Sequence, residues 1–201
     1  MFPPDAGSAP LLLGLALGMR HALDADHVVA MSTIVARERS VARAALLGGW
    51  WGAGHSITLL GVGLLVILFR MPVGPAFGAW FERAVGVMLV LLGLSSLWFR
   101  HRHDRSHGGR ARPFGVGMVH GLAGSGALAV AVLATMPSRA AGLVYLLLFG
   151  LGAVGGMAGV TAALALPARL GAFGSRGASW LTAAAGVGSV AFGLFYLTVS
   201  A

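Results

Sequence analysis

Six apolar runs divide the chain, and each is about as long as a helix that crosses a lipid bilayer. They cover about 10–36, 44–69, 80–99, 113–136, 141–166 and 179–200. Hydrophobic residues make up 57% of the chain and charged residues only 10%, whereas a soluble domain has about 25% charged residues. The pattern predicts an all-α integral membrane protein with six transmembrane helices.

The arginines predict how these helices are oriented. Ten arginines fall in the connections that follow the first, third and fifth runs: Arg37, Arg39, Arg43, Arg100, Arg102, Arg105, Arg110, Arg112, Arg169 and Arg176. The two other connections contain only Arg70 and Arg139. Because basic loops stay in the cytoplasm, we expect both termini outside, in a multi-pass protein of a prokaryotic cell membrane.

A short internal repeat suggests that the chain has two related halves. Gly18-Met19-Arg20-His21-Ala22-Leu23 matches Gly117-Met118-Val119-His120-Gly121-Leu122, 99 positions later. Each copy opens a set of three helices, and an odd number of crossings gives the two sets opposite orientations. We therefore expect inverted three-helix repeats, as in many secondary transporters, with halves at 1–99 and 113–201 and a basic, His-rich cytoplasmic loop at 100–112.

The first apolar run contains an unusual group of polar residues: His21, Asp24, Asp26 and His27. An Asp within a membrane costs roughly 2.5–3.5 kcal/mol on insertion scales, so such residues usually have a function. Imidazole and carboxylate are ligands for divalent transition metals. We predict a metal site here; the alternative is a buried polar cluster that locks two helices together.

Helical periodicity distinguishes the two carboxylates of this group. On a regular helix His21, Asp24 and His27 share one stripe, whereas Asp26 points elsewhere. Either Asp26 orients an imidazole instead of binding the metal, or the helix is distorted at this point.

The second and fourth runs add further candidates. His55 lies inside the second run and is predicted to be a ligand or to lie next to one, with Ser56 beside it. Thr58 is expected to bond back to its own helix. His120, the repeat counterpart of His21, is expected either to line the opposite half of an ion pathway or to serve in packing. Arg20 can pair with Asp24, extend to the membrane surface, or offset the negative charge of the site.

Composition excludes several classes of function. The chain has no cysteine, which excludes a thiolate metal site and a thiol–disulfide conductor. Without lysine it cannot form a Gly-x-x-x-x-Gly-Lys nucleotide-binding loop. Its arginines lie between apolar spans and not in an aromatic-basic pattern, so we expect no nucleic-acid partner.

The segment Arg20-His21-Ala22-Leu23-Asp24-Ala25-Asp26-His27 resembles the His-x-x-x-x-Asp-His signature of the nickel/cobalt transporter family. Gly54-His55-Ser56 resembles the second box of that family, and His120–Gly126 looks like its short, six-helix, urease-accessory-type nickel permeases. This resemblance implies Ni²⁺ or Co²⁺ as the transported ion, whereas the ligand chemistry alone also allows Zn²⁺.

The leading hypothesis is therefore a secondary transporter, not an enzyme, that carries Ni²⁺ or Co²⁺ as cargo and holds no permanent cofactor. Its surroundings are the lipid bilayer, and a homo-oligomer is compatible with this reading. The alternatives are an intramembrane metal-dependent hydrolase and an accessory membrane subunit that hands over metal.

Overall fold

Every secondary-structure element of the described residues is a helix. The computed structural model describes residues 9–36, 38–69, 75–98, 109–121, 136, 138–170 and 175–199. Its helices are α1 (Ala9–His21), α2 (Ala25–Val35), α3 (Val41–Phe69), α4 (Pro75–Trp98), α5 (Ala111–His120), α7 (Arg139–Arg169) and α8 (Ser175–Val199). The predicted all-α class is confirmed. Residues 122–135 of the predicted fourth helix and the histidines of the 100–108 segment lie outside the described residues.

Four of these helices are long and apolar enough to cross a membrane. They are α3, residues 78–98 of α4, α7, and residues 179–199 of α8, and they agree with four of the six predicted runs. Each of these four apolar runs forms one helix, and each helix begins a few residues before its run. Ser138 caps the start of α7, since its hydroxyl accepts a hydrogen bond from the backbone N–H of Ala141 at 3.1 Å.

The first apolar run forms two helices, so the prediction of one continuous helix over 10–36 was wrong. After His21 the chain makes a tight turn, in which the N–H groups of Leu23 and Asp24 bond to the carbonyls of Arg20 and His21 at 2.9 and 3.1 Å. Asp24 then adopts an extended backbone (φ −60°, ψ 142°) and α2 begins at Ala25. The distorted alternative is thus the one found, and the single stripe of His21, Asp24 and His27 does not exist.

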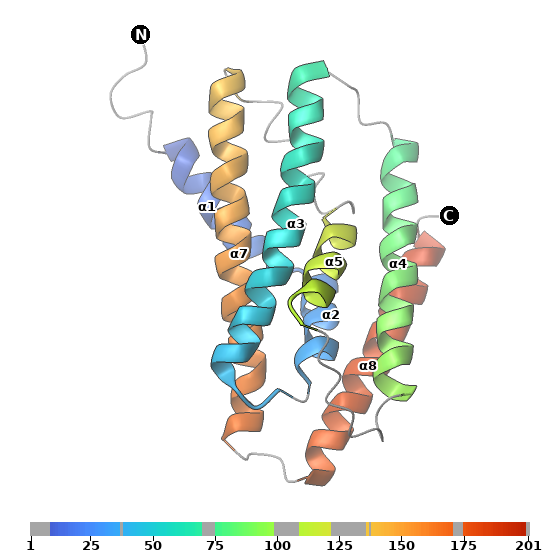
Figure 1. The fold of residues 1–201 in the computed structure, drawn as a ribbon. Helices are drawn as coiled ribbons and strands as arrows, with labels where there is room; N and C mark the ends of the chain where they lie inside the picture. Colours follow the sequence, from blue (N-terminus) through green and yellow to red (C-terminus); the bar gives the residue numbers. More distant parts are fainter. Residues whose placement is uncertain are drawn as a thin grey trace.

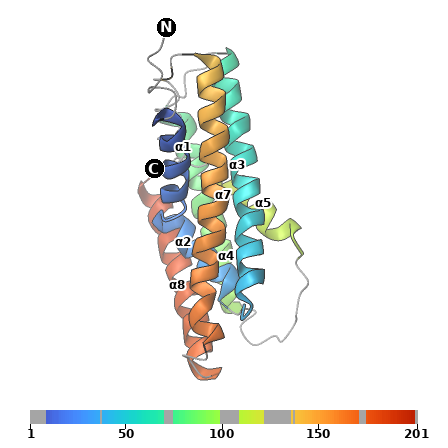
Figure 2. The ribbon, with the colours of Figure 1, turned by 90° about the vertical axis from the view of Figure 1, so that its left-hand side faces the viewer.

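The helices pack as two groups joined by α2 (Figure 1). In one group α3 lies against α7, with α1 packed on α7 and α5 packed on α3. In the other group α4 lies against α8. The short helix α2 contacts α7, α4 and α8, so the residues at its start lie where the two groups meet. The break between α1 and α2 lies about halfway along the bundle (Figure 2).

Glycines bring the backbones of α4 and α8 close together in a crossed pattern. A Cβ at Gly93 would fall too close to the carbonyl of Gly186 and to Val190. In the reverse direction, a Cβ at Gly193 would crowd the carbonyl of Gly86 and Val90. Small residues of this kind allow helices to approach closely in membranes, where van der Waals contact is a main source of helix association.

We expect Gly93→Ala to destabilise the α4–α8 pair, because the new methyl group meets backbone atoms that cannot rotate away. Overpacking of this kind costs about 1–3 kcal/mol, so thermal unfolding in detergent, followed by tryptophan fluorescence, should begin at a lower temperature. The matched control is Gly188→Ala in α8, where a Cβ would have no atom within 4 Å. Equal stability of the two variants would contradict this packing.

Candidate metal centre

Four histidines from four helices meet in the interior of the bundle. His21 ends α1, His27 lies in the first turn of α2, His55 lies in α3 and His120 ends α5. Their exposed fractions are 6%, 0%, 1% and 0%. A group of imidazoles so fully removed from solvent needs polar partners, since an unpaired buried polar group costs about 1–3 kcal/mol.

Each histidine of the first apolar run is paired with a carboxylate through its Nδ1 atom. His21 Nδ1 lies 2.9 Å from Asp24 Oδ2, and His27 Nδ1 lies 3.0 Å from Asp26 Oδ1. A carboxylate in this position fixes the tautomer and the orientation of a metal-binding imidazole. The pairing leaves the Nε2 atoms of both rings to face other groups.

We define a first triad of candidate ligands as His21, His27 and His55. One ligand atom from each of these residues lies within 4.8 Å of the other two. His21 Nε2 is 3.1 Å from His55 Nε2, and His27 Nε2 has no hydrogen-bond partner. Three convergent imidazole nitrogens are a suitable ligand set for Ni²⁺, Co²⁺ or Zn²⁺.

A second triad, defined as Asp26, His27 and His120, lies next to the first and shares His27 with it. Asp26 Oδ1 accepts a hydrogen bond from the backbone N–H of His27 at 3.0 Å, and Oδ2 lies 3.0 Å from His120 Nε2. The Tyr196 hydroxyl of α8 is 3.5 Å from the same Oδ2 atom. Asp26 therefore links α2 to α5 and lies close to α8.

The two carboxylates differ in burial, and in the opposite sense to a regular helix that carries His21, Asp24 and His27 on one stripe. Asp26 is 3% exposed and lies at the centre of the cluster, whereas the side chain of Asp24 is 47% exposed and lies at its edge. The cause is the break after His21, which turns α2 relative to α1. Both carboxylates are bonded to imidazoles, as expected of groups that orient ligands.

Aromatic rings surround the cluster, and sequence reasoning did not identify them. Trp51 stacks on His27 with ring centroids 6.2 Å apart and planes 10° apart, and it meets His120 edge-on at 5.6 Å. Phe149 of α7 lies 5.4 Å from His21. Only Trp51 had a sequence signal, because it is four residues before His55 and therefore on the same face of α3.

The remaining predicted residues lie around this centre. The Ser56 hydroxyl donates to the carbonyl of Gly150 at 3.0 Å and so joins α3 to α7. Thr58 bonds back to the Gly54 carbonyl at 3.2 Å, as expected. Arg20 is exposed, and the carboxylate of Asp24 bonds to His21 instead of to Arg20.

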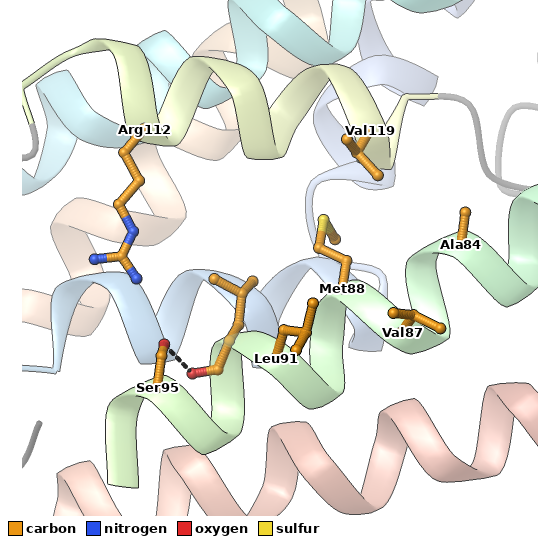
Figure 3. A pocket seen from close by; sticks show the side chains of 8 residues that line it. Ala84, Val87, Met88, Leu91, Ser95, Arg112 and Val119 are labelled. Atoms are coloured by element: carbon orange, nitrogen blue, oxygen red, sulfur yellow. Dashed lines mark hydrogen bonds between the residues drawn. The ribbon is translucent and has the colours of Figure 1, made fainter. Parts of the chain in front are cut away.

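An open apolar groove between α4 and α5 is a different kind of site (Figure 3). Its volume is 460 Å³, and the residues that line it are Ala84, Val87, Met88, Leu91, Leu92, Ser95, Arg112 and Val119. The Ser95 hydroxyl is bonded to the Leu92 carbonyl at 2.8 Å, and the charged group of the lining is the cationic Arg112. This groove offers no ligands to a metal cation.

We expect Asp26→Ala to destabilise the protein more than Asp24→Ala. Without Asp26, the ring of His27, its backbone N–H and the ring of His120 all lose a buried partner, at about 1–3 kcal/mol each. Without Asp24, one ring loses a half-exposed partner, which costs less because water can replace it. Thermal unfolding of both variants without added metal measures the difference, and a smaller loss for Asp26→Ala would refute the central position of this carboxylate.

Comparisons with known proteins place the chain in a family. It is 34% identical to the urease accessory protein UreH of Bacillus sp. (strain TB-90) over 204 aligned positions, which cover 93% of this chain and 90% of that protein. No family model matches the chain, and no solved structure matches it. Identity at this level over nearly the whole length agrees with the resemblance of the His-x-x-x-x-Asp-His segment. The chain therefore belongs to the nickel/cobalt transporter family, with the UreH-type urease accessory proteins.

Proposed function

We propose that this protein transports Ni²⁺ or Co²⁺ across the cell membrane of a prokaryote by secondary transport. The observation that carries the proposal is the first triad, three buried imidazoles in a bundle with four membrane-length helices. Buried imidazole nitrogens in this environment replace the water ligands of the ion. No cysteine is present to hold the ion as a thiolate site would, so the ligands are suited to binding that is reversible.

In this proposal His21, His27 and His55 bind the ion directly, and Asp24 and Asp26 orient the imidazoles. The support is the pairing of His21 Nδ1 with Asp24 and of His27 Nδ1 with Asp26. The relative is named as a urease accessory protein, and family membership favours Ni²⁺ or Co²⁺ over Zn²⁺. Both oxygens of the buried Asp26 lie 3.0 Å from imidazole nitrogens, so this carboxylate is held as a partner of the histidines and not as the general base of a metal-dependent hydrolase.

We further propose six membrane crossings in two inverted halves, 1–99 and 113–201, joined by a cytoplasmic loop at 100–112. Crossed contacts between the halves support this. A Cβ at Gly54 of α3 would meet Phe114 and Met118 of α5, and a Cβ at Gly152 of α7 would meet Leu15 and Met19 of α1. The contacted residues of α1 and α5 differ by the same 99 positions as the sequence repeat.

Exposed tryptophans support the placement in the bilayer. Trp80 and Trp98 of α4 are 69% and 81% exposed, and Trp180 of α8 is 75% exposed. Tryptophan is enriched at the two surfaces of a membrane. Trp98 lies 18 positions after Trp80, which corresponds to about 27 Å at 1.5 Å per residue and is close to the thickness of the hydrocarbon layer of about 30 Å.

We expect His21→Ala, His27→Ala and His55→Ala each to abolish metal uptake into proteoliposomes while the protein still inserts and folds. Loss of a group that only orients a ligand typically costs 10–100-fold in metal affinity, and loss of a ligand should cost at least as much. The assay is ⁶³Ni flux in both orientations, with Co²⁺ and Zn²⁺ as competitors.

The control is Ser189→Ala, which removes a buried hydrogen bond of 2.7 Å between α8 and the Leu89 carbonyl of α4 and changes no residue of either triad. It should keep wild-type flux. Wild-type flux in any of the three histidine variants would remove that residue from the ligand set. Absence of flux in the wild-type protein, with metal still bound, would favour an accessory subunit that hands over metal.

We expect single cysteines at positions 105 and 8 to be labelled from opposite sides of the membrane. The chain has no cysteine of its own, so Arg105→Cys and Ser8→Cys are each the sole reporter in their variant. Residue 105 should react only with a membrane-permeant thiol reagent in intact cells, because the basic loop stays in the cytoplasm. Labelling of both positions by an impermeant reagent would contradict the proposed topology.

A further inference from the structure

We propose that the transported ion occupies two positions in succession, the first triad and then the second, and that His27 is a ligand in both. This inference rests on the proposed transport function and adds to it a second metal site, at Asp26, His27 and His120. The ring of His27 has different neighbours in the two triads: His21 and His55 in the first, Asp26 and His120 in the second. An ion can therefore exchange these ligands while it stays bound to His27.

The geometry around His27 supports this path. Its ring centroid is 4.5 Å from that of His21 and 4.3 Å from that of His120. Its Nδ1 atom faces Asp26, which belongs to the second triad, and its Nε2 atom has no hydrogen-bond partner. The ring of His27 is therefore in contact with a histidine that belongs only to the first triad and with one that belongs only to the second.

The first triad includes His21 from α1, and the second includes His120 from α5. These two helices run in opposite directions, as their contacts with α7 and α3 show. Helix α1 is parallel to α7, since Gly14 lies against Tyr145 and Gly18 against Phe149. Helix α5 is parallel to α3, since Gly117 lies against Trp51 and Gly121 against His55.

The two long helices themselves are antiparallel, because Gly48 of α3 lies against Met157 of α7, and Gly63 of α3 lies against Leu146. Helices α1 and α5 thus approach the cluster from opposite ends of the bundle, and each ends at its histidine. The first triad is then associated with the side from which α1 enters, and the second with the side from which α5 enters.

The chemistry of the two positions differs in a way that suits sequential binding. The first triad offers three imidazoles, whereas the second includes a carboxylate that offsets part of the charge of a divalent ion in a poorly solvated interior. His120 Nδ1 is fully buried without a hydrogen-bond partner. For Nε2 of this ring to bind the ion, the neutral ring has to be the tautomer that carries its proton on Nδ1.

The test separates the binding of an ion by His120 from its contact with Asp26. In His120→Gln, a side-chain amide can still donate a hydrogen bond to Asp26, but it is a poor ligand for Ni²⁺ or Co²⁺. In His120→Ala, both functions are lost. We expect both variants to lower ⁶³Ni flux at least tenfold, while the equilibrium affinity for Co²⁺ in detergent changes less than about threefold, because the first triad remains.

A second measurement uses His21→Ala, which should leave the second triad as the better site. We expect Co²⁺ still to bind, at least tenfold more weakly, and X-ray absorption to detect a carboxylate oxygen among its ligands. The double variant His21→Ala, His120→Ala should bind Co²⁺ at least tenfold more weakly than His21→Ala alone. Ser189→Ala is again the control for a lost buried hydrogen bond outside the cluster.

The outcomes test the second metal position separately from the transport function. Wild-type flux in His120→Gln, or nitrogen-only ligation of Co²⁺ in His21→Ala, would overturn the second position and leave the transport proposal intact. A wild-type protein that binds Co²⁺ without transporting it would overturn transport, and the spectrum of His21→Ala would still decide between one position and two. A wild-type protein that binds neither ion would overturn both.

Discussion

The hydrogen bonds of Asp26 hold together the parts of the molecule that matter for its chemistry. One oxygen bonds to the ring and the backbone of His27, and the other lies 3.0 Å from His120 and 3.5 Å from the Tyr196 hydroxyl. A carboxylate within an apolar bundle is tolerated only when its oxygens are satisfied. Asp26 meets this condition by drawing side chains from α2, α5 and α8 to one point, and the position of the cluster follows from it.

The break in the first helix is what allows this arrangement. In a continuous helix, residues 24 and 26 would point in different directions, and only one of them could face His21 and His55. The turn at Ala22–Asp24 lets His21 remain at the end of α1 while Asp26 and His27 enter the interior from the first turn of α2. The unpaired N–H groups at the start of α2 favour a nearby acidic residue, which agrees with Asp26 in that turn.

Sequence alone predicted the parts of the molecule that depend on apolar length. The helices α3, α4, α7 and α8 were predicted close to their observed positions, since each is one uninterrupted apolar run. It also identified His21, Asp24, Asp26, His27 and His55 as one group, because such residue types are costly in a membrane. Sequence could not choose between a regular and a broken helix at His21, and it therefore left open which of Asp24 and Asp26 faces the cluster.

The contacts of Trp51, Phe149 and Tyr196 with the cluster were missed for a related reason. Phe149 and Tyr196 come from segments distant in the sequence, and aromatic residues in a membrane helix carry no local sign of what they contact. Trp51 shares a face of α3 with His55, but its contact with His27 depends on where α2 lies relative to α3. His120 was found only through the repeat. Its distance from Asp26 depends on how α5 packs on α3, which the Gly-rich pattern allows but does not specify.

The glycine contacts between helices follow a repeated pattern along the chain, whereas the polar residues of the cluster do not. The contacts between glycines and their neighbours recur in both halves, as between α4 and α8, where Gly86 faces Gly193 and Gly93 faces Gly186. The candidate ligands do not recur: 99 positions after Asp26 and His27 the sequence has Ser125 and Gly126. His120 is the member of the cluster that lies in the proposed second half, 113–201.

This difference has a physical consequence for a carrier. In the proposed inverted arrangement, two half-bundles with equivalent packing can exchange conformations at little cost, because each contact that is lost on one side has a counterpart on the other. Two equivalent carboxylate–imidazole sites would instead place two buried charges close together, and their repulsion in a medium of low polarity is costly. With the carboxylates confined to one half, the cluster has one strongly anionic group at its centre, and the single histidine from α5 connects it to the other half.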